Sequence, residues 1–157
     1  MSRIFVLLTV AAALGIAMPA SGSDKPVNLS GKWTLNKDKS EFARGAPDSM
    51  TAIIADDGKK IHMTQTVAGS DGERTSELVV DRDNESVNHL GDMEMRTKLR
   101  QEGAKLFENT RFSGPRGELT RKSVITLSGD GKTLTLDSDY ESPDGGFHEK
   151  IVLDRGD

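Results

Sequence analysis

Short turns containing glycine recur along this chain and separate segments in which apolar and polar residues alternate. Six stretches place a glycine shortly before a run rich in β-branched or apolar residues: DDGKKI, SDGERT, QEGAKL, GPRGEL, GDGKTL and PDGGFH. Glycine readily adopts the positive φ that tight hairpin turns require. This spacing predicts consecutive antiparallel strands joined by short turns.

The alternation between the turns has a period of two, as expected for strands with one face directed toward a core. In KIHMTQTV, for example, Ile61, Met63 and Val67 share a face with Gln65. The pattern predicts strands over the ranges 31–36, 50–55, 60–68, 74–81, 85–90, 93–101, 105–113, 119–127, 133–140 and 147–155. A meander of this length tends to curl until its edges pair. We therefore predict an all-β fold, an antiparallel up-and-down β-barrel of about 8–10 strands.

The N-terminal residues predict a cleaved export signal. The first three residues carry one positive charge, residues 4–17 form an apolar run, and small residues follow in MPASGS. The run is too short for a membrane span, and no second apolar stretch follows it. We expect a signal peptide over residues 1–20, with Ala17 and Gly22 as alternative cleavage sites, and a single barrel domain over residues 21–157. An N-terminal buried helix is the alternative interpretation.

Charge and cysteine content indicate the class of protein. The chain has 21 basic and 25 acidic residues, and loss of Arg3 with the signal would leave 20 against 25, a net charge of about −5. A mildly acidic surface argues against binding to nucleic acid or to anionic lipid. Without cysteine, an exported chain depends on sheet hydrogen bonds and core packing for stability. These features fit a periplasmic or secreted bacterial protein, which we expect to be a monomer.

The stretch NLSGKWTLNKDKSEF contains the only tryptophan, Trp33, close to the expected start of the mature chain. SGKW followed by a strand resembles the Gly-x-Trp signature that opens the first strand in the lipocalin and calycin group of small-molecule-binding barrels. The resemblance implies that Trp33 closes the floor of the barrel and that an arginine of the last strand packs across its ring. Gly31 and Trp33 match the motif, and Arg155 in IVLDR has the position of the partner. An arginine over an indole is a cation–π contact.

A closer resemblance is to small exported bacterial lipocalin-like proteins, which begin with G.W.LN..KS.F and carry a late LS.DGKTLT hairpin. Residues 31–42 and 127–135 match these two patterns. The resemblance covers the mature chain as a pattern and implies a lipocalin-like barrel. It says little about activity, because one barrel hosts many functions.

Residues suited to catalysis or metal binding are scattered along the chain. His62, His89 and His148 lie in different strands or turns, without the paired spacing of a metal site. The stretch DRDNE lacks the glycine and the distal glutamate of a calcium loop, and no serine is surrounded by a nucleophile-elbow sequence. We therefore expect no metal, no cofactor and no enzymatic activity.

Several polar residues share the parity of apolar neighbours and should point into the barrel: Gln65, Thr97, Glu108, Thr110, Arg121, Ser123, Ser138, Tyr140 and Glu149. Buried charges must be paired or solvated. Either Glu108 or Glu149 therefore pairs with Arg121, or the lumen holds water and a ligand. Glu108 is the nearer candidate, because the SGPRG turn joins its strand to that of Arg121. A β-bulge that reverses the parity and places these residues outside is the alternative.

Two functional hypotheses follow from this arrangement. The first is a module that binds a small amphipathic or hydrophobic molecule inside the barrel. Its expected ligand-binding residues are Met63, Gln65, Met95, Glu108, Phe112, Arg121 and Tyr140. The second is a filled barrel that acts through its outer surface, as an envelope or secreted interaction protein or as an inhibitor of another exported protein.

Overall fold

The structure is a computed structural model that describes residues 25–156. These residues form ten strands and one 3-10 turn: β1 (Gly31–Leu35), η1 (Lys37–Lys39), β2 (Ser49–Asp56), β3 (Lys60–Gly69), β4 (Gly72–Asp81), β5 (Ser86–Leu90), β6 (Met93–Glu102), β7 (Lys105–Gly114), β8 (Gly117–Leu127), β9 (Thr133–Ser142) and β10 (Gly145–Arg155). The strands lie where the alternating pattern predicts them. The expected signal peptide lies outside the described residues.

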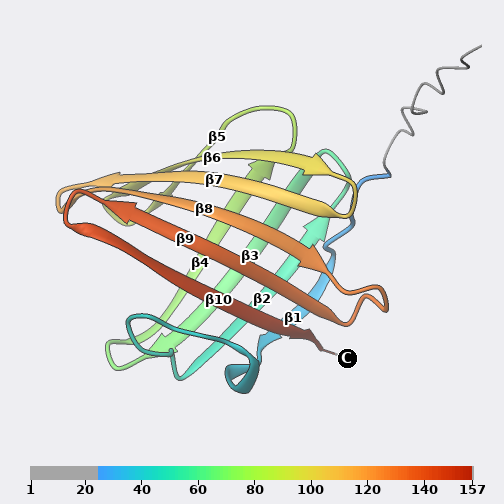
Figure 1. Ribbon diagram of the computed structural model, residues 1–157, viewed down its shortest axis with the longest axis horizontal. Coiled ribbons are helices and arrows are strands. Elements are labelled where there is room, and N and C mark those ends of the chain that lie inside the picture. The colour runs from blue at the N-terminus through green and yellow to red at the C-terminus, as the bar shows by residue number, and fades with distance from the viewer. Residues whose placement is uncertain (1–24, 157) are drawn as a thin grey trace, which may run out of the picture.

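All neighbouring strands run antiparallel and follow one another up and down around a barrel (Figure 1). The hydrogen-bonded order is β4-β3-β2-β1-β10-β9-β8-β7-β6-β5, so the first and last strands are neighbours. In Figure 1, β7 to β10 lie in front of β2 to β4, which gives the barrel two facing walls. The predicted fold is confirmed as a nearly closed, ten-stranded barrel over residues 25–156. In this part of the chain, no helix is long and apolar enough to cross a membrane.

The edges that remain are those of β4 and β5, and side chains bridge them. The Asn88 carboxamide accepts a hydrogen bond from the Val79 backbone N–H and donates one to the Val79 carbonyl, both at 2.9 Å. At the end of β4, next to the connection that leads to β5, the Asp81 N–H donates to the Ser86 hydroxyl at 2.6 Å. A carboxamide has a donor and an acceptor, as a peptide group does, so Asn88 takes the place of a backbone partner. These contacts form a seam between β4 and β5.

The strand parity agrees with the sequence. Pairing between β7, β8, β9 and β10 runs in unbroken steps, so no bulge reverses the inward face there. The alternative in which a bulge places the polar residues outside is therefore wrong for these strands. Thr97, Thr110, Ser123 and Ser138 are buried. They hydrogen bond in pairs across neighbouring strands, with Thr97 to Thr110 at 2.9 Å and Ser123 to Ser138 at 2.8 Å.

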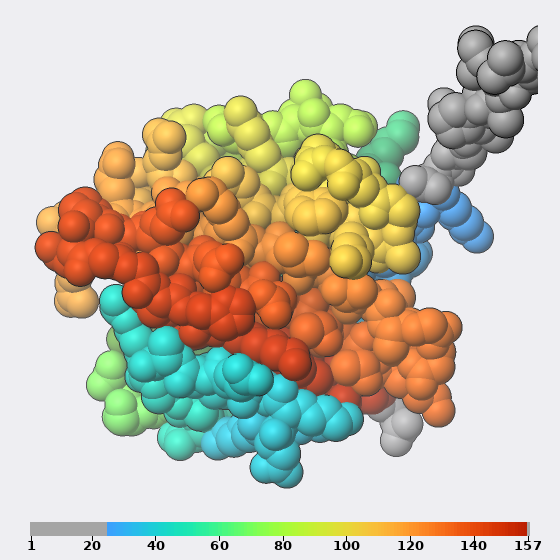
Figure 2. Space-filling model, viewed as in Figure 1, coloured from blue at the N-terminus to red at the C-terminus, as the bar shows by residue number. Residues whose placement is uncertain are grey.

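The connection between β1 and β2 continues along β10. Ser40 donates a hydrogen bond to the Asn36 carbonyl at 2.7 Å and accepts one from the Val152 N–H at 2.9 Å. Glu41 and Lys150 then form a short antiparallel bridge. Figure 2 shows this segment, in cyan, packed directly beside the red strand β10. The connection thus covers the edge of β10 that the short strand β1 leaves free.

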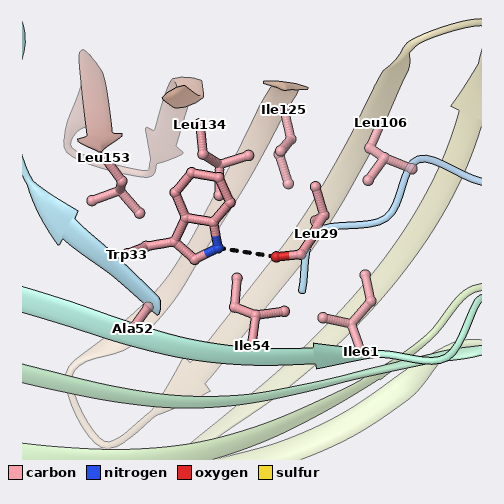
Figure 3. Packing of buried hydrophobic residues seen from close by; sticks show 9 residues of the cluster. All are labelled: Leu29, Trp33, Ala52, Ile54, Ile61, Leu106, Ile125, Leu134 and Leu153. Carbon is pink, nitrogen blue, oxygen red and sulfur yellow. Dashed lines mark hydrogen bonds between the residues drawn. The ribbon is translucent and has the colours of Figure 1, made fainter. Parts of the chain in front are cut away.

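One end of the barrel is closed by apolar side chains around Trp33, which has no exposed surface. Its indole Nε1 donates a hydrogen bond to the Leu29 carbonyl at 3.0 Å, as drawn in Figure 3. The closed-end cluster consists of Leu29, Trp33, Ala52, Ile54, Ile61, Leu106, Ile125, Leu134 and Leu153. Its members come from most of the strands around the barrel, so their burial joins the two walls at this end.

Arg155 covers the Trp33 ring, as the resemblance implies. The guanidinium carbon lies 4.4 Å from the ring centroid. Its nitrogens donate to the Ser30 carbonyl at 2.7 Å and to the Gly131 carbonyl at 2.6 Å. Gly31 has a φ of +148°, and a Cβ at this position would overlap the guanidinium. The glycine of the Gly-x-Trp motif therefore leaves room for the arginine.

A buried ion pair holds the segment before β1 across the closed end. Asp56 Oδ2 lies 2.5 Å from an Arg82 nitrogen, and their side chains are 0% and 8% exposed. Asp56 also accepts a hydrogen bond from the Leu29 N–H at 3.0 Å, and Arg82 donates to the Val27 carbonyl at 2.6 Å. The Val27 N–H donates to Gln101 at 3.1 Å. Both charges are thus compensated by each other and by backbone groups, as a buried pair requires.

Candidate functional site

The barrel encloses a cavity of about 770 Å³ on the other side of the closed-end cluster. Its lining includes Gly69 at the end of β3, Ser70 of the β3–β4 turn and residues 44–48 of the β1–β2 connection. These residues are largely exposed, which places the mouth at the end opposite Trp33. The volume falls within the roughly 300–1,000 Å³ that is typical of small-molecule sites.

The two walls of the cavity differ in polarity. Strands β2, β3 and β4 form an apolar wall of Met50, Ala52, Ile54, Ile61, Met63, Val67, Leu78 and Val80, in which Gln65 is the polar exception. Strands β7 to β10 contribute one polar residue each to the lining, and we call these four the polar strip: Glu108, Arg121, Tyr140 and Glu149. The cavity is therefore suited to a molecule with one apolar part and one polar part.

Arg121 and Glu108 form an ion pair within the polar strip. The Arg121 Nε donates to Glu108 Oε1 at 3.1 Å, and the Thr110 hydroxyl donates to the same oxygen at 2.8 Å. The guanidinium also lies 5.5 Å from the Phe112 ring centroid. Burial lowers the pKa of Arg121, but the charge of Glu108 and the neighbouring Tyr140 outweigh it, so the pKa lies above its ordinary value. Arg121 is therefore charged at any physiological pH.

Aromatic rings lead from the polar strip to the mouth. Tyr140, which is paired with Arg121 in the β8–β9 register, stacks on Phe147 of β10. The two ring centroids are 4.4 Å apart and the planes differ by 8°. Arg44 of the β1–β2 connection places its guanidinium carbon 4.2 Å from the Phe147 centroid. This contact links the connection to the cavity wall through a cation–π interaction.

No protein-family model matches this sequence, and no curated protein is significantly similar to it. Solved structures with the same fold do exist. A zebrafish ileal bile acid-binding protein in complex with cholic acid aligns with a TM-score of 0.57 and 17% identity, over 82% of this chain and 98% of that chain. A secretory abundant heat soluble protein of Ramazzottius varieornatus aligns with a TM-score of 0.56 and 16% identity, over 85% and 100% of the two chains. The fluorescent protein UnaG aligns with a TM-score of 0.55 and 15% identity, over 81% and 96%.

The fold is a lipocalin-like barrel. At these identities the similarity concerns the fold alone. The matched structures are covered almost completely, so the lipocalin-like barrel accounts for their whole length. Two of the three names describe a binding protein and a fluorescent protein, and none of them names an enzyme.

The lipocalin-like barrel brings together all the residues that the sequence analysis assigns to a ligand site. All seven line the cavity described above: Met63, Gln65, Met95, Glu108, Phe112, Arg121 and Tyr140. Gly31, Trp33 and Arg155 lie at the closed end, outside it. Of the two carboxylates considered as partners for Arg121, the structure selects Glu108 and leaves Glu149 in the lining without an ion pair among residues 25–156.

The sequence analysis did not predict two other residues near the cavity of the lipocalin-like barrel, Arg44 and Phe147. Arg44 and the connection around it reach the mouth from a segment without alternation, so no periodic signal marks them. Phe147 shares the parity of Ile151, and that signal could have identified it as a residue on the inward face that packs against Tyr140 of the lining. The three histidines lie apart, and no cluster of three His, Cys, Asp or Glu residues suited to a metal ion occurs within residues 25–156.

Proposed function

We propose that this chain is an exported protein that binds a small amphipathic molecule in the lumen of its barrel and acts as a monomer. The observation that carries the proposal is the cavity, in which an apolar wall faces a polar strip. An apolar lining with a few polar groups is the usual composition of small-molecule sites. The export signal predicted over residues 1–20 supports the proposed location.

The fold supports the same proposal. The zebrafish barrel, whose name states that it binds bile acid, is in complex with cholic acid, so a barrel of this topology accommodates a ligand of that size. The alternative hypothesis, surface interaction by a filled barrel, needs a lumen without space. A cavity of about 770 Å³ argues against that alternative.

The proposal can be tested with N-phenyl-1-naphthylamine, a neutral probe whose fluorescence increases in apolar surroundings. We expect the probe to bind the purified protein saturably, with one site per chain. Met63 lies in the apolar wall, so Met63→Trp would place a bulky indole ring in the lumen and reduce the space for the probe. It should weaken binding at least tenfold, or about 1.4 kcal/mol. Ile53→Trp is the control, because Ile53 is 59% exposed on the outer face of β2.

The two variants separate lumen binding from attachment to the surface. Retention of binding in Ile53→Trp together with its loss in Met63→Trp supports a site inside the barrel. No saturable binding to the wild type, or equal loss in both variants, would contradict the proposal. Mass spectrometry of the native protein from its own host would then identify any molecule that copurifies with it.

A further inference from the structure

Two polar side chains on the strands that line the cavity have no partner within residues 25–156. The Gln65 carboxamide on β3 and the Glu149 carboxylate on β10 both line the cavity, and neither hydrogen bonds or forms an ion pair in this part of the chain. Both are partly exposed, so water reaches them when the cavity has no guest. They differ in this respect from Glu108, whose carboxylate is engaged by Arg121 and Thr110.

Glu149 lies between the apolar floor and the aromatic rings. Its neighbours on the inward face of β10 are Ile151, toward the closed end, and Phe147, toward the mouth. In the β9–β10 register it is opposite Ser138. The Ser138 hydroxyl is already hydrogen bonded to Ser123 at 2.8 Å. Within residues 25–156 the Glu149 carboxylate forms no ion pair, although the Arg44 guanidinium lies over the neighbouring Phe147 ring.

The charges of the polar strip do not cancel. Arg121 is neutralised by Glu108, which leaves the charge of Glu149 uncompensated. Arg44 at the mouth is exposed and forms no ion pair with Glu149, and its own connection also carries Asp48 in the lining. A carboxylate on the ligand would meet one paired arginine and one like charge at close range, which is unfavourable in a partly desolvated site.

We propose that the polar group of the ligand is a cation with N–H donors, an ammonium or a guanidinium group, that pairs with Glu149. This inference rests on the proposed function and specifies the class of ligand. Charge-assisted hydrogen bonds to a carboxylate are among the strongest polar contacts available in such a cavity. The stacked rings of Tyr140 and Phe147 lie next to the same position and would pack against the part of the ligand beside its polar group.

Gln65 has a second part in this arrangement. It lies on β3, in the apolar wall that faces β8 and β9 across the lumen (Figure 1). A neutral carboxamide both donates and accepts, so it can contact a hydroxyl or carbonyl elsewhere on the ligand without a preference of charge. Glu149 would thus decide the sign of the polar group, and Gln65 would favour a second, uncharged polar atom.

Three ligands that share a twelve-carbon chain test the proposed preference: dodecylamine, 1-dodecanol and dodecanoate. Each would displace N-phenyl-1-naphthylamine at pH 7, below the concentration at which it forms micelles. We expect dodecylamine to bind at least tenfold more tightly than dodecanoate, with 1-dodecanol between them. Dodecanoate that binds as tightly as dodecylamine, or more tightly, would overturn the inference.

Substitution of Glu149 tests whether this residue causes the preference for an amine over a carboxylate. Glu149→Gln keeps the size of the side chain and should bring the amine and the carboxylate within about threefold of each other. Glu77→Gln is the matched control, because Glu77 is exposed on the outer face of β4, and it should keep the wild-type ratio. An unchanged ratio in Glu149→Gln would overturn the inference while probe binding still supports the proposed function. Absence of probe binding to the wild type would overturn both.

Discussion

The two ends of the barrel treat their polar groups differently. At the closed end, the Asp56 and Arg82 charges are buried together and also bind the backbone of the segment before β1. Trp33 likewise finds a backbone partner within the core. At the open end, Gln65 and Glu149 face the cavity without partners in residues 25–156. The closed end uses its polar groups for stability, whereas the open end keeps polar groups available to a guest.

The difference arises from what covers each end. The segment at residues 27–29 crosses the closed end and offers its peptide groups to Asp56, Arg82 and Gln101. The β1–β2 connection instead lies along the edge of β10 (Figure 2). Of its residues, Phe42 and residues 44–48 line the cavity. Within residues 25–156, the hydrogen bonds of Glu108 and Arg121 in the polar strip are made to side chains and not to the backbone.

The largest contrast is expected from loss of an aromatic ring at each end. Trp33→Ala should lower the free energy of unfolding by about 3–5 kcal/mol, because it leaves a cavity in a fully packed core. Phe147→Ala, at the open end, should cost less than about 2 kcal/mol, because that ring is partly exposed. Urea unfolding followed by circular dichroism measures both.

Tryptophan emission provides an independent check on the closed end. The wild type should emit at short wavelength because Trp33 is fully buried, and Arg155→Ala should shift the emission to longer wavelength by uncovering the ring. Equal losses of stability from Trp33→Ala and Phe147→Ala, or wild-type emission typical of an exposed indole, would contradict the proposed division of roles.

A smaller contrast is expected from the two ion pairs. Asp56→Ala would leave Arg82 buried without its partner and should cost about 3 kcal/mol. Glu108→Ala should cost less, because the Arg121 side chain is 22% exposed and water from the cavity can solvate it. Thermal unfolding of the two variants at neutral pH compares them directly. A greater loss from Glu108→Ala would show that the open end is the more tightly packed.

The smallest effects concern pH, and they should have opposite signs at the two ends. In the closed-end turns, backbone N–H groups of Lys60 and Asp83 lower the pKa of Asp57 and Asp81, respectively, below the ordinary 3.8. The stabilisation is therefore present above pH 3.8 and is lost as the pH falls through the lower, folded-state pKa. NMR titration of the Lys60 and Asp83 amide signals should give midpoints below 3.8.

His148 supplies the counterpart near the open end of β10. Its hydrogen bond to Asp139, aided by the charge of Asp137, raises its pKa above the ordinary 6.5. Its contribution is present below pH 6.5 and is lost as the pH rises through the folded-state pKa. The imidazole signals should titrate above 6.5 in the wild type and closer to it in Asp139→Asn. A midpoint at or below 6.5 in the wild type would contradict the contact.

Much of the barrel could be predicted because its signals are local. Turn glycines and a period of two determine where strands lie and which side chains point inward, and Ile61, Met63 and Gln65 follow that pattern in the structure. The contact between Glu108 and Arg121 was also accessible, because a short hairpin joins their strands and makes them neighbours. Adjacent strands leave few alternatives for a side-chain partner.

The remaining features depend on geometry that has no local signal. Asp56 and Arg82 lie on different hairpins, and their pairing depends on how the ends of β2 and β4 meet below the closed-end cluster. The reach of Arg44 to Phe147 depends on the path of an irregular connection. The size of the lumen depends on the volumes of all the side chains that meet across the barrel, so alternation could predict a polar wall but not the space in front of it.

The seam between β4 and β5 makes the girth of this barrel adjustable. Elsewhere, widening the barrel would break continuous backbone ladders, whereas here it would break a few hydrogen bonds to Asn88 and Ser86. Local openings of this kind require far less free energy than unfolding of a strand. We therefore expect the barrel wall to open first along the line between β4 and β5, where the hairpins on either side can stay intact.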